Sequence, residues 1–433
     1  MLAVYRHMFT IPDLRKKILF TLFVFALYRL GTAVPVPGVD VERVQTLAET
    51  QEQAGIIALL NLFSGGALES FSVFALGIMP YITASIIMQL LTVVIPRLQK
   101  LQDEGEAGRK QITQWTRYLT VLLALLQSTG FTALFRGPLT QGIDLIPGAT
   151  PGRIVLIVIT MTAGTALIMW FGELITQRGV GNGMSLIIFI SIISQLPSSF
   201  GLMYQATVGA DRAFRFLVLL GVFLAMVVGI LFVEQGQRRI PIQFAKRIRG
   251  RRVMGGQSTY IPLKVNMAGV IPVIFATSVM YFPALISTAI PSDVGFFRSI
   301  RGFIDENLAN PASLFYIVAL FVLILFFTYF YTAIQFDPVR QADLIQRQGG
   351  FIPGVRPGPQ TSRYLERILN RITLPGSIYL AVLAILPSII AAIWNIPIGF
   401  SGVSILIVVG VALETMKQVE SQLTMRNYEG FLT

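Results

Sequence analysis

Ten long apolar segments, separated by stretches that hold most of the charge, constrain this sequence more than any other feature. A helix that crosses a lipid bilayer needs about 20 mostly apolar residues. Charged residues make up only 13% of the chain, against about 25% in an ordinary soluble domain. The sequence therefore predicts an all-α multi-span membrane protein. Its predicted spans are 18–34, 70–95, 115–135, 154–173, 184–200, 214–233, 267–290, 313–335, 374–393 and 400–416.

The distribution of Lys and Arg predicts how these helices are oriented. Cytoplasmic loops of membrane proteins are enriched in both residues. With a cytoplasmic N-terminus, 26 of the 34 Lys and Arg lie on the cytoplasmic side, 7 on the outer side, and Arg29 in the first span. The net charge of +12 then divides into +14 inside, −3 outside and +1 in the membrane. We therefore expect both termini in the cytoplasm.

The kinds of residue present exclude several functions. The chain has no Cys, and its one His is His7, so zinc sites and Ser-His or Cys-His catalytic pairs at depth are not expected. Ion-coupled transporters usually carry ionisable residues at mid-membrane. Here the spans hold Arg29, near the outer end of the first, and Glu173, at the cytoplasmic end of the fourth. We expect Arg29 to extend outward without a role in transport, and we expect no enzyme activity, metal or cofactor.

A nonapeptide occurs twice. Gly77–Ser85 in span two and Gly269–Thr277 in span seven share Gly, Pro, Ile and Ala at the same offsets. Each lies in the second span of a group of five, and five is odd, so the two groups would have opposite topology. This predicts an inverted repeat with halves at 1–200 and 201–433. The alternative is chance similarity of two apolar helices. We expect both prolines to open the hydrogen-bond ladder inside a span.

Three further segments do not fit a simple span. Residues 55–68 are apolar but too short to cross the membrane, and Gly65-Gly66 break them before span two. They could re-enter the membrane as a plug, or lie flat on the outer leaflet. The loops 234–265 and 336–373 are long and basic, with a Gly/Pro frame around Arg356. Their charge suits anionic lipid, and also RNA phosphate or an acidic partner.

A series of ordered motifs runs along the chain at Pro35–Asp40, Asn61–Ala67, Gly77–Ser85, Gly179–Ser185, Gly236–Arg239, Gly250–Arg252, Gln257–Thr259, Leu263–Pro272 and Gly354–Gly358. Together these motifs resemble the SecY family, the central subunit of the bacterial protein-conducting channel. The resemblance covers nearly the whole chain and implies ten helices in two inverted halves around an hourglass pore, with a short re-entrant plug helix. Unfolded secretory polypeptides would cross the plasma (inner) membrane there, and transmembrane segments would leave sideways through a lateral gate.

The resemblance also implies roles for individual residues. The pore ring would consist of Ile78, Ile82, Met184, Ile188, Ile274 and Ile407. The plug would include Ile56, Ile57, Leu60, Asn61, Phe63, Gly65 and Gly66. Lateral-gate positions would be Thr83, Gln89, Gln127 and Phe282. The docking residues for the ribosome or a motor would be Arg238, Arg239, Lys246, Arg251, Arg252 and Arg356.

Simpler roles remain open for these residues. The isoleucines could be ordinary packing residues, and the polar gate residues could join helices without gating. The resemblance implies the SecE and SecG subunits of a heterotrimer, the motor ATPase SecA, the ribosome through its RNA, signal sequences and nascent chains, and membrane lipids as partners. A small-solute secondary transporter is the alternative, but it calls for an ionisable site at mid-membrane. A ribosome receptor with no pore would leave the plug and the repeat unexplained.

Overall fold

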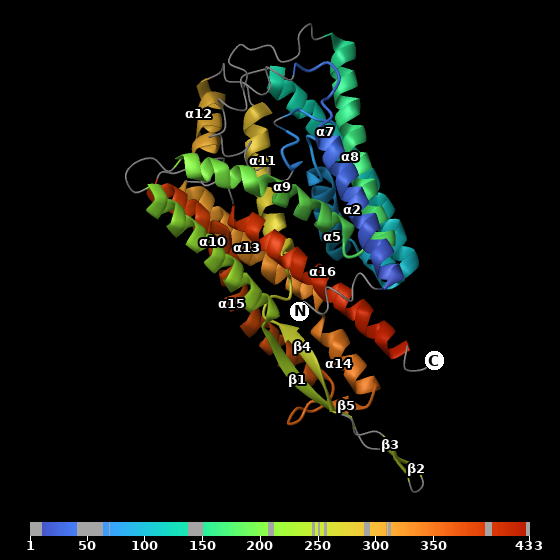
Figure 1. The fold of residues 1–433 in the computed structure, drawn as a ribbon. Coiled ribbons are helices and arrows are strands. Elements are labelled where there is room, and N and C mark those ends of the chain that lie inside the picture. The colour runs from blue at the N-terminus through green and yellow to red at the C-terminus, as the bar shows by residue number, and fades with distance from the viewer. Residues whose placement is uncertain are drawn as a thin grey trace.

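A computed structural model shows the protein as long helices with a small β-structure at one end (Figure 1). The structure describes residues 11–40, 64–68, 70–136, 150–206, 212–244, 247–249, 252–254, 258–289, 295–308, 310, 313–394 and 401–429.

A helix occupies each of the ten predicted spans. These helices are α2 (Pro12–Thr32), α5 (Met79–Val94), α7 (Glu106–Arg136), α8 (Pro151–Arg178), α9 (Gly183–Ala206), α10 (Arg212–Gln235), α11 (Ile271–Ala289), α13 (Leu314–Gln335), α15 (Pro359–Trp394) and α16 (Gly402–Glu429). Among the described residues, six helices are long and apolar enough to cross a membrane. A seventh span is possible if α5 and α6 (Pro96–Asp103), which are bent by 100° relative to each other, count as one. An all-α multi-span membrane protein is therefore confirmed.

Several predicted spans begin at the wrong residue, since α2 and α7 start at Pro12 and Glu106 where residues 18 and 115 were expected. Span two was expected from residue 70, but α5 starts at Met79, and residues 70–78 are turns and a β-bridge. Span nine was expected from residue 374, but α15 starts at Pro359. Hydropathy locates the part of a helix that lies in lipid, and it does not detect a helix that continues into water or a buried segment without helical hydrogen bonds.

The repeated nonapeptide forms the same helix start twice. Gly77 and Gly269 have φ angles of +57° and +62°. Pro80 and Pro272 are each the second residue of their helix. Downstream, the Ile82 amide donates to the Ile78 carbonyl at 3.1 Å, and the Ile274 amide donates to the Val270 carbonyl at 3.2 Å.

The expectation that these prolines interrupt a helix was therefore wrong. A first-turn residue has no helical acceptor for its N–H, so proline costs nothing there and its fixed φ favours the helix. The glycine before it takes a left-handed conformation that ends the preceding turn.

The long basic loops carry β-structure that hydropathy did not predict. β1 (Gln237–Phe244) pairs antiparallel with β4 (Ser258–Lys264), and β5 (Gly350–Phe351) pairs with β1 on its other side, in the order β4-β1-β5. β2 (Arg247–Arg249) and β3 (Arg252–Met254) form a separate short ladder. Alternating residues of β1, Ile240 and Ile242, are buried against α14 (Pro338–Arg347) and the first turns of α15.

The ten helices form two groups that meet along two seams. In the first group α7 packs between α5 and α8, and α8 also contacts α2 and α9. In the second, α13 packs between α11 and α15, and α16 contacts α10 and α15. The groups touch where α11 contacts α5 and α7, and where α9 contacts α10 and α16. Figure 1 shows the β-strands at one end of the molecule and α12 (Gly295–Phe303), followed by the π-helix Ile304–Leu308, at the other.

A candidate apolar pore and its gate

Five of the six pore-ring candidates lie in one buried apolar cluster. Ile78 and Ile82 come from the start of α5, Ile188 from α9, Ile274 from α11 and Ile407 from α16. Their exposed fractions are 1%, 6%, 4%, 8% and 0%. The five isoleucines thus come from two helices of each group, within a larger apolar core to which other helices also contribute. A constriction lined by such side chains excludes water and ions by dewetting.

The sixth candidate, Met184, packs against the same cluster from the first turn of α9 and is only half-buried. Its position depends on Gly172 of α8, because a Cβ atom at Gly172 would collide with the Met184 Sδ atom. A thioether is flexible and polarisable, so this part of the cluster can deform more easily than an isoleucine.

The candidate gate residues lie on helices that form one of the two seams. Thr83 on α5 and Gln127 on α7 are buried. Gln89 on α5 is half-buried, and its Nε2 atom donates to Ser85 Oγ of the same helix at 3.3 Å. The side chain of Phe282 lies outside the described residues. Both α5 and α7 contact α11, so the polar residues belong to helices that meet the second group.

The plug candidates are only partly described. Ile56, Ile57, Leu60, Asn61 and Phe63 lie outside the described residues. Gly65 and Gly66 have φ angles of +69° and +85°, a region that favours glycine. A Cβ at Gly65 would lie 3.2 Å from Ser191 Cα, and one at Gly66 would collide with the Gln195 amide. This segment therefore packs its backbone directly on α9.

A group of polar residues that the sequence did not reveal contacts this glycine pair. Tyr28 Oη donates to the Ser64 carbonyl at 3.1 Å and lies 2.7 Å from Ser191 Oγ. Arg29 Nη1 donates to the Gly65 carbonyl at 2.7 Å. We call Tyr28, Arg29 and Ser191 the polar clamp. Arg29 is an exposed residue, and it also binds the Gly65 backbone, because a carbonyl within its reach accepts a charge-assisted hydrogen bond.

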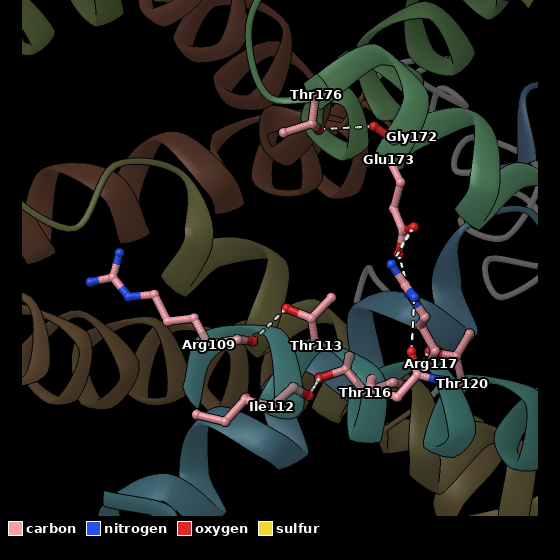
Figure 2. Close-up of polar contacts among 10 residues, drawn as sticks. Arg109, Ile112, Thr113, Thr116, Arg117, Thr120, Gly172, Glu173 and Thr176 are labelled. Carbon is pink, nitrogen blue, oxygen red and sulfur yellow. Dashed lines mark hydrogen bonds and ion pairs between the residues drawn. The ribbon is translucent and has the colours of Figure 1, made fainter. Parts of the chain in front are cut away.

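An ion pair joins α7 to α8 (Figure 2). Arg117 Nε and Nη2 donate to the two Glu173 oxygens at 2.6 and 2.7 Å, and Arg117 Nη1 donates to Gln114 Oε1 at 2.8 Å. This bidentate pairing holds α7, which borders the seam, against α8. The two residues are 56 positions apart, so the sequence carried no local signal for it.

Three of the six docking candidates are described with their side chains, and all are exposed. Arg238 and Arg239 lie on β1, where the Arg239 guanidinium stands 4.9 Å from the centre of the Tyr260 ring. Arg356 lies in a turn between Gly354 and Gly358, both with positive φ. Pairing of β5 with β1 joins the two basic loops into one surface. Lys246, Arg251 and the Arg252 side chain lie outside the described residues.

A buried hydrogen-bond pair connects this β-structure to α11. Asn266 lies between β4 and α11 and is buried. Its Nδ2 atom donates to Glu234 Oε1 at 2.5 Å and to the Gly269 carbonyl at 3.0 Å. Next to it, the Val265 amide donates to the Gly236 carbonyl at 3.0 Å. The base of the β1–β4 hairpin is therefore fixed to the turn that starts α11.

The fold and this site define an all-α, multi-span membrane protein whose two helix groups meet at a buried apolar cluster. The family model described as SecY matches residues 72–416. A protein translocase subunit SecY of Streptomyces scabiei is 52% identical over 442 aligned residues, which cover all of both chains. The chain belongs to the SecY family.

Solved structures with low sequence identity share the fold. One is described as a SecY protein whose plug domain stabilises the closed state of the translocation channel. It has a TM-score of 0.65 at 18% identity, covering 94% of this chain and 92% of that one. Another is Sec61 in the canine ribosome-channel complex from the endoplasmic reticulum, with a TM-score of 0.59 at 17% identity and the same coverage.

Proposed function

We propose that this chain is a protein-conducting channel that translocates unfolded secretory polypeptides across the membrane and releases transmembrane segments sideways into lipid. The observation that carries the proposal is the burial of Ile78, Ile82, Ile188, Ile274 and Ile407 in the one apolar core that both helix groups of this SecY-family protein share. An aliphatic ring blocks water when empty and makes no side-chain-specific hydrogen bonds when occupied. Such a ring therefore suits a polypeptide substrate, because a different side chain occupies the ring at each step of translocation.

The seam between α11 and the pair α5 and α7 is the proposed lateral gate. Thr83 and Gln127 are buried on the two helices that α11 contacts. An apolar signal helix packs on such a seam at the expense of contacts between α11 and its neighbours. Because the signal helix binds the open arrangement more tightly than the closed one, it shifts the population of channels toward the open state.

The exposed basic surface on β1 and the turn at Arg356 is the proposed docking face. Its partners would be the ribosome, through RNA phosphate, or the motor ATPase SecA. In this proposal the channel assembles with SecE and SecG and contacts membrane lipids. Both termini are cytoplasmic, and the halves are 1–200 and 201–433. The partner supplies the driving force, and the chain itself catalyses no reaction. The family match gives no support to a small-solute transporter.

Crosslinking of a translocating chain tests the proposal most directly. We would place a photoreactive residue at Ile78 or at Ile274 and stall a secretory polypeptide in the membrane. Both probes should crosslink to the stalled chain, because both side chains belong to the proposed ring. A probe at Phe232, which is 81% exposed on α10, is the control and should not crosslink. Equal labelling from all three positions would overturn the pore assignment.

A further inference from the structure

The base of the predicted plug is attached to the channel wall at two places of different character. Residues Phe71–Val73 are joined to the segment after α2 by backbone hydrogen bonds. Val36 N donates to the Phe71 carbonyl at 3.0 Å, and Val73 N donates to the Val34 carbonyl at 2.9 Å. Ser64 and Gly65, nearer to the plug, are bound by the side chains of the polar clamp. Side chains alone can be substituted without changing the backbone, so this second attachment can be tested separately.

Tyr28 and Ser191 are the buried members of the clamp, whereas Arg29 is an exposed residue. Tyr28 and Ser191 have exposed fractions of 0%, and Ser64 of 1%. Ser191 Oγ also lies 2.8 Å from the Ile187 carbonyl, within hydrogen-bond distance. The Tyr28 ring stacks on Phe74 with 5.7 Å between centroids. A buried hydroxyl that loses its partner costs the desolvation of the group left behind, so the three residues favour one position of the segment strongly over others.

Charge adds to this preference at Gly65. The Arg29 guanidinium is a charged donor, and a hydrogen bond from a charged donor is about twice as strong as a neutral one. It ends on the carbonyl of a glycine whose left-handed conformation and contact with Ser191 leave no space for a side chain. The clamp and the glycine pair are therefore complementary. The clamp contributes side chains from α2 and α9, and the segment contributes the backbone carbonyls of Ser64 and Gly65.

We propose that Tyr28, Arg29 and Ser191 are positioning residues that hold Ser64–Gly66, the base of the plug, and thereby stabilise the closed channel. The inference rests on the proposed channel function. Loss of a clamp hydrogen bond shifts the equilibrium toward the open state by removing contacts made only when the segment is seated. Within the described part of the chain, the side-chain hydrogen bonds of the clamp end on Ser64, Gly65, Ile187 and the clamp itself, and none reaches the basic loops. We therefore expect docking not to depend on it.

Ion leak from reconstituted vesicles tests the proposal. Tyr28→Phe and Arg29→Gln should each raise the leak of the resting channel about five- to tenfold, the effect of losing roughly one buried hydrogen bond. Arg29→Lys should restore part of the seal. Thr32→Val is the matched control, because Thr32 Oγ1 donates to the Arg29 backbone carbonyl within the same helix, and its removal leaves the side-chain bonds of the clamp intact.

A second measurement separates a loosened segment from a misfolded protein. The chain has no Cys, so Ser64→Cys introduces a single thiol at a buried position. A membrane-impermeant thiol reagent should label it slowly in the parent and several-fold faster with Tyr28→Phe or Arg29→Gln added. Membrane insertion and thermal unfolding should stay close to the parent.

The outcomes distinguish this inference from the channel function. If Ile82→Asn with Ile274→Asn raises the leak while the clamp variants change neither leak nor labelling, the clamp proposal is wrong and the channel stands. If the ring variant and the clamp variants all leave the leak unchanged, the proposed channel itself fails. Increased leak and labelling in Thr32→Val would also overturn the clamp, because it would show that any change near α2 has the same effect.

Discussion

Isoleucine at the apolar cluster illustrates how one residue type serves both folding and function. Ile82 and Ile274 occupy equivalent places in the repeated nonapeptide, each with its amide bonded to the fourth residue before it. Their side chains are buried in the same cluster. A branched aliphatic side chain packs tightly and offers no hydrogen bond, so the same chemistry closes the structure and leaves a passing chain unbound.

A polar substitution at both positions should open this seal. Ile82→Asn with Ile274→Asn is expected to raise ion leak through reconstituted vesicles and to relax signal-sequence selectivity. The reason is that the two introduced Asn side chains hold water in the cluster. Ile87→Asn on the same helix is the control, since Ile87 is half-buried and is not among the residues of the apolar core or those packed against it. Unchanged leak in the double variant would show that these residues do not form the barrier.

Glycine at the base of the plug should be just as hard to replace. Gly65→Ala places a Cβ 3.2 Å from Ser191 Cα at a φ of +69°, and it is expected to destabilise the protein by about 1–2 kcal/mol. Gly130→Ala is the control, because a Cβ there meets nothing within 4 Å. Thermal unfolding in detergent should show a lower midpoint for Gly65→Ala only. Equal midpoints would contradict the close packing on α9.

At the scale of elements, the position of α7 depends on polar contacts as well as on lipid-facing leucines. It packs between α5 and α8 and also contacts α11 across the seam. Arg117 and Glu173 fix it to α8. One side of α7, the proposed gate helix, is therefore attached to α8 in its own group. Another side of α7 contacts α11 and can separate from the second group.

Removing this ion pair should loosen α7 modestly. The Arg117 side chain is 36% exposed, so solvent screening limits the pair to about 1 kcal/mol. Glu173→Gln, Arg117→Gln and the double variant should show a coupling energy of about that size in a double-mutant cycle of detergent unfolding. Arg340→Gln with Asp103→Asn is the comparison cycle, because that pair is 3.9 Å apart and well exposed. Equal coupling energies in the two cycles would mean that the closer and less exposed geometry of the Arg117–Glu173 pair adds nothing to stability.

At the scale of the whole molecule, the β-structure and α12 lie at opposite ends (Figure 1). The β1–β4 hairpin continues through Asn266 into α11, and Asn266 binds both Glu234 and the Gly269 carbonyl. The proposed docking face and the proposed gate helix are thus parts of one connected segment of chain.

Reversing the charge at the docking face should impair transport without affecting insertion. Arg356→Glu is expected to reduce partner-driven translocation at least about tenfold, because an exposed Arg that binds phosphate or carboxylate contributes roughly 1–3 kcal/mol per contact. Arg298→Glu on α12 is the matched control at the opposite end. Normal translocation by Arg356→Glu, measured as protected substrate in inverted vesicles, would exclude this residue from docking.

Sequence patterns located the ten helices, the repeat and the family. They missed the start of α5, the β-strands of the basic loops and the Arg117–Glu173 pair. Apolar segments report where a chain contacts lipid, and this signal is local. The β1–β4 pairing and the ion pair join residues distant in sequence, and neither partner has a composition that identifies the other.

By itself, the sequence determined the class of this protein and its spans, because the bilayer admits only segments that satisfy their own backbone hydrogen bonds. It also identified the isoleucines through a family resemblance. Only the tertiary structure decided that five of these isoleucines are buried in one apolar core, and that Arg29, an exposed residue, binds the Gly65 carbonyl. Contacts between helices depend on three-dimensional packing, and hydropathy along a chain does not encode which side chains will meet.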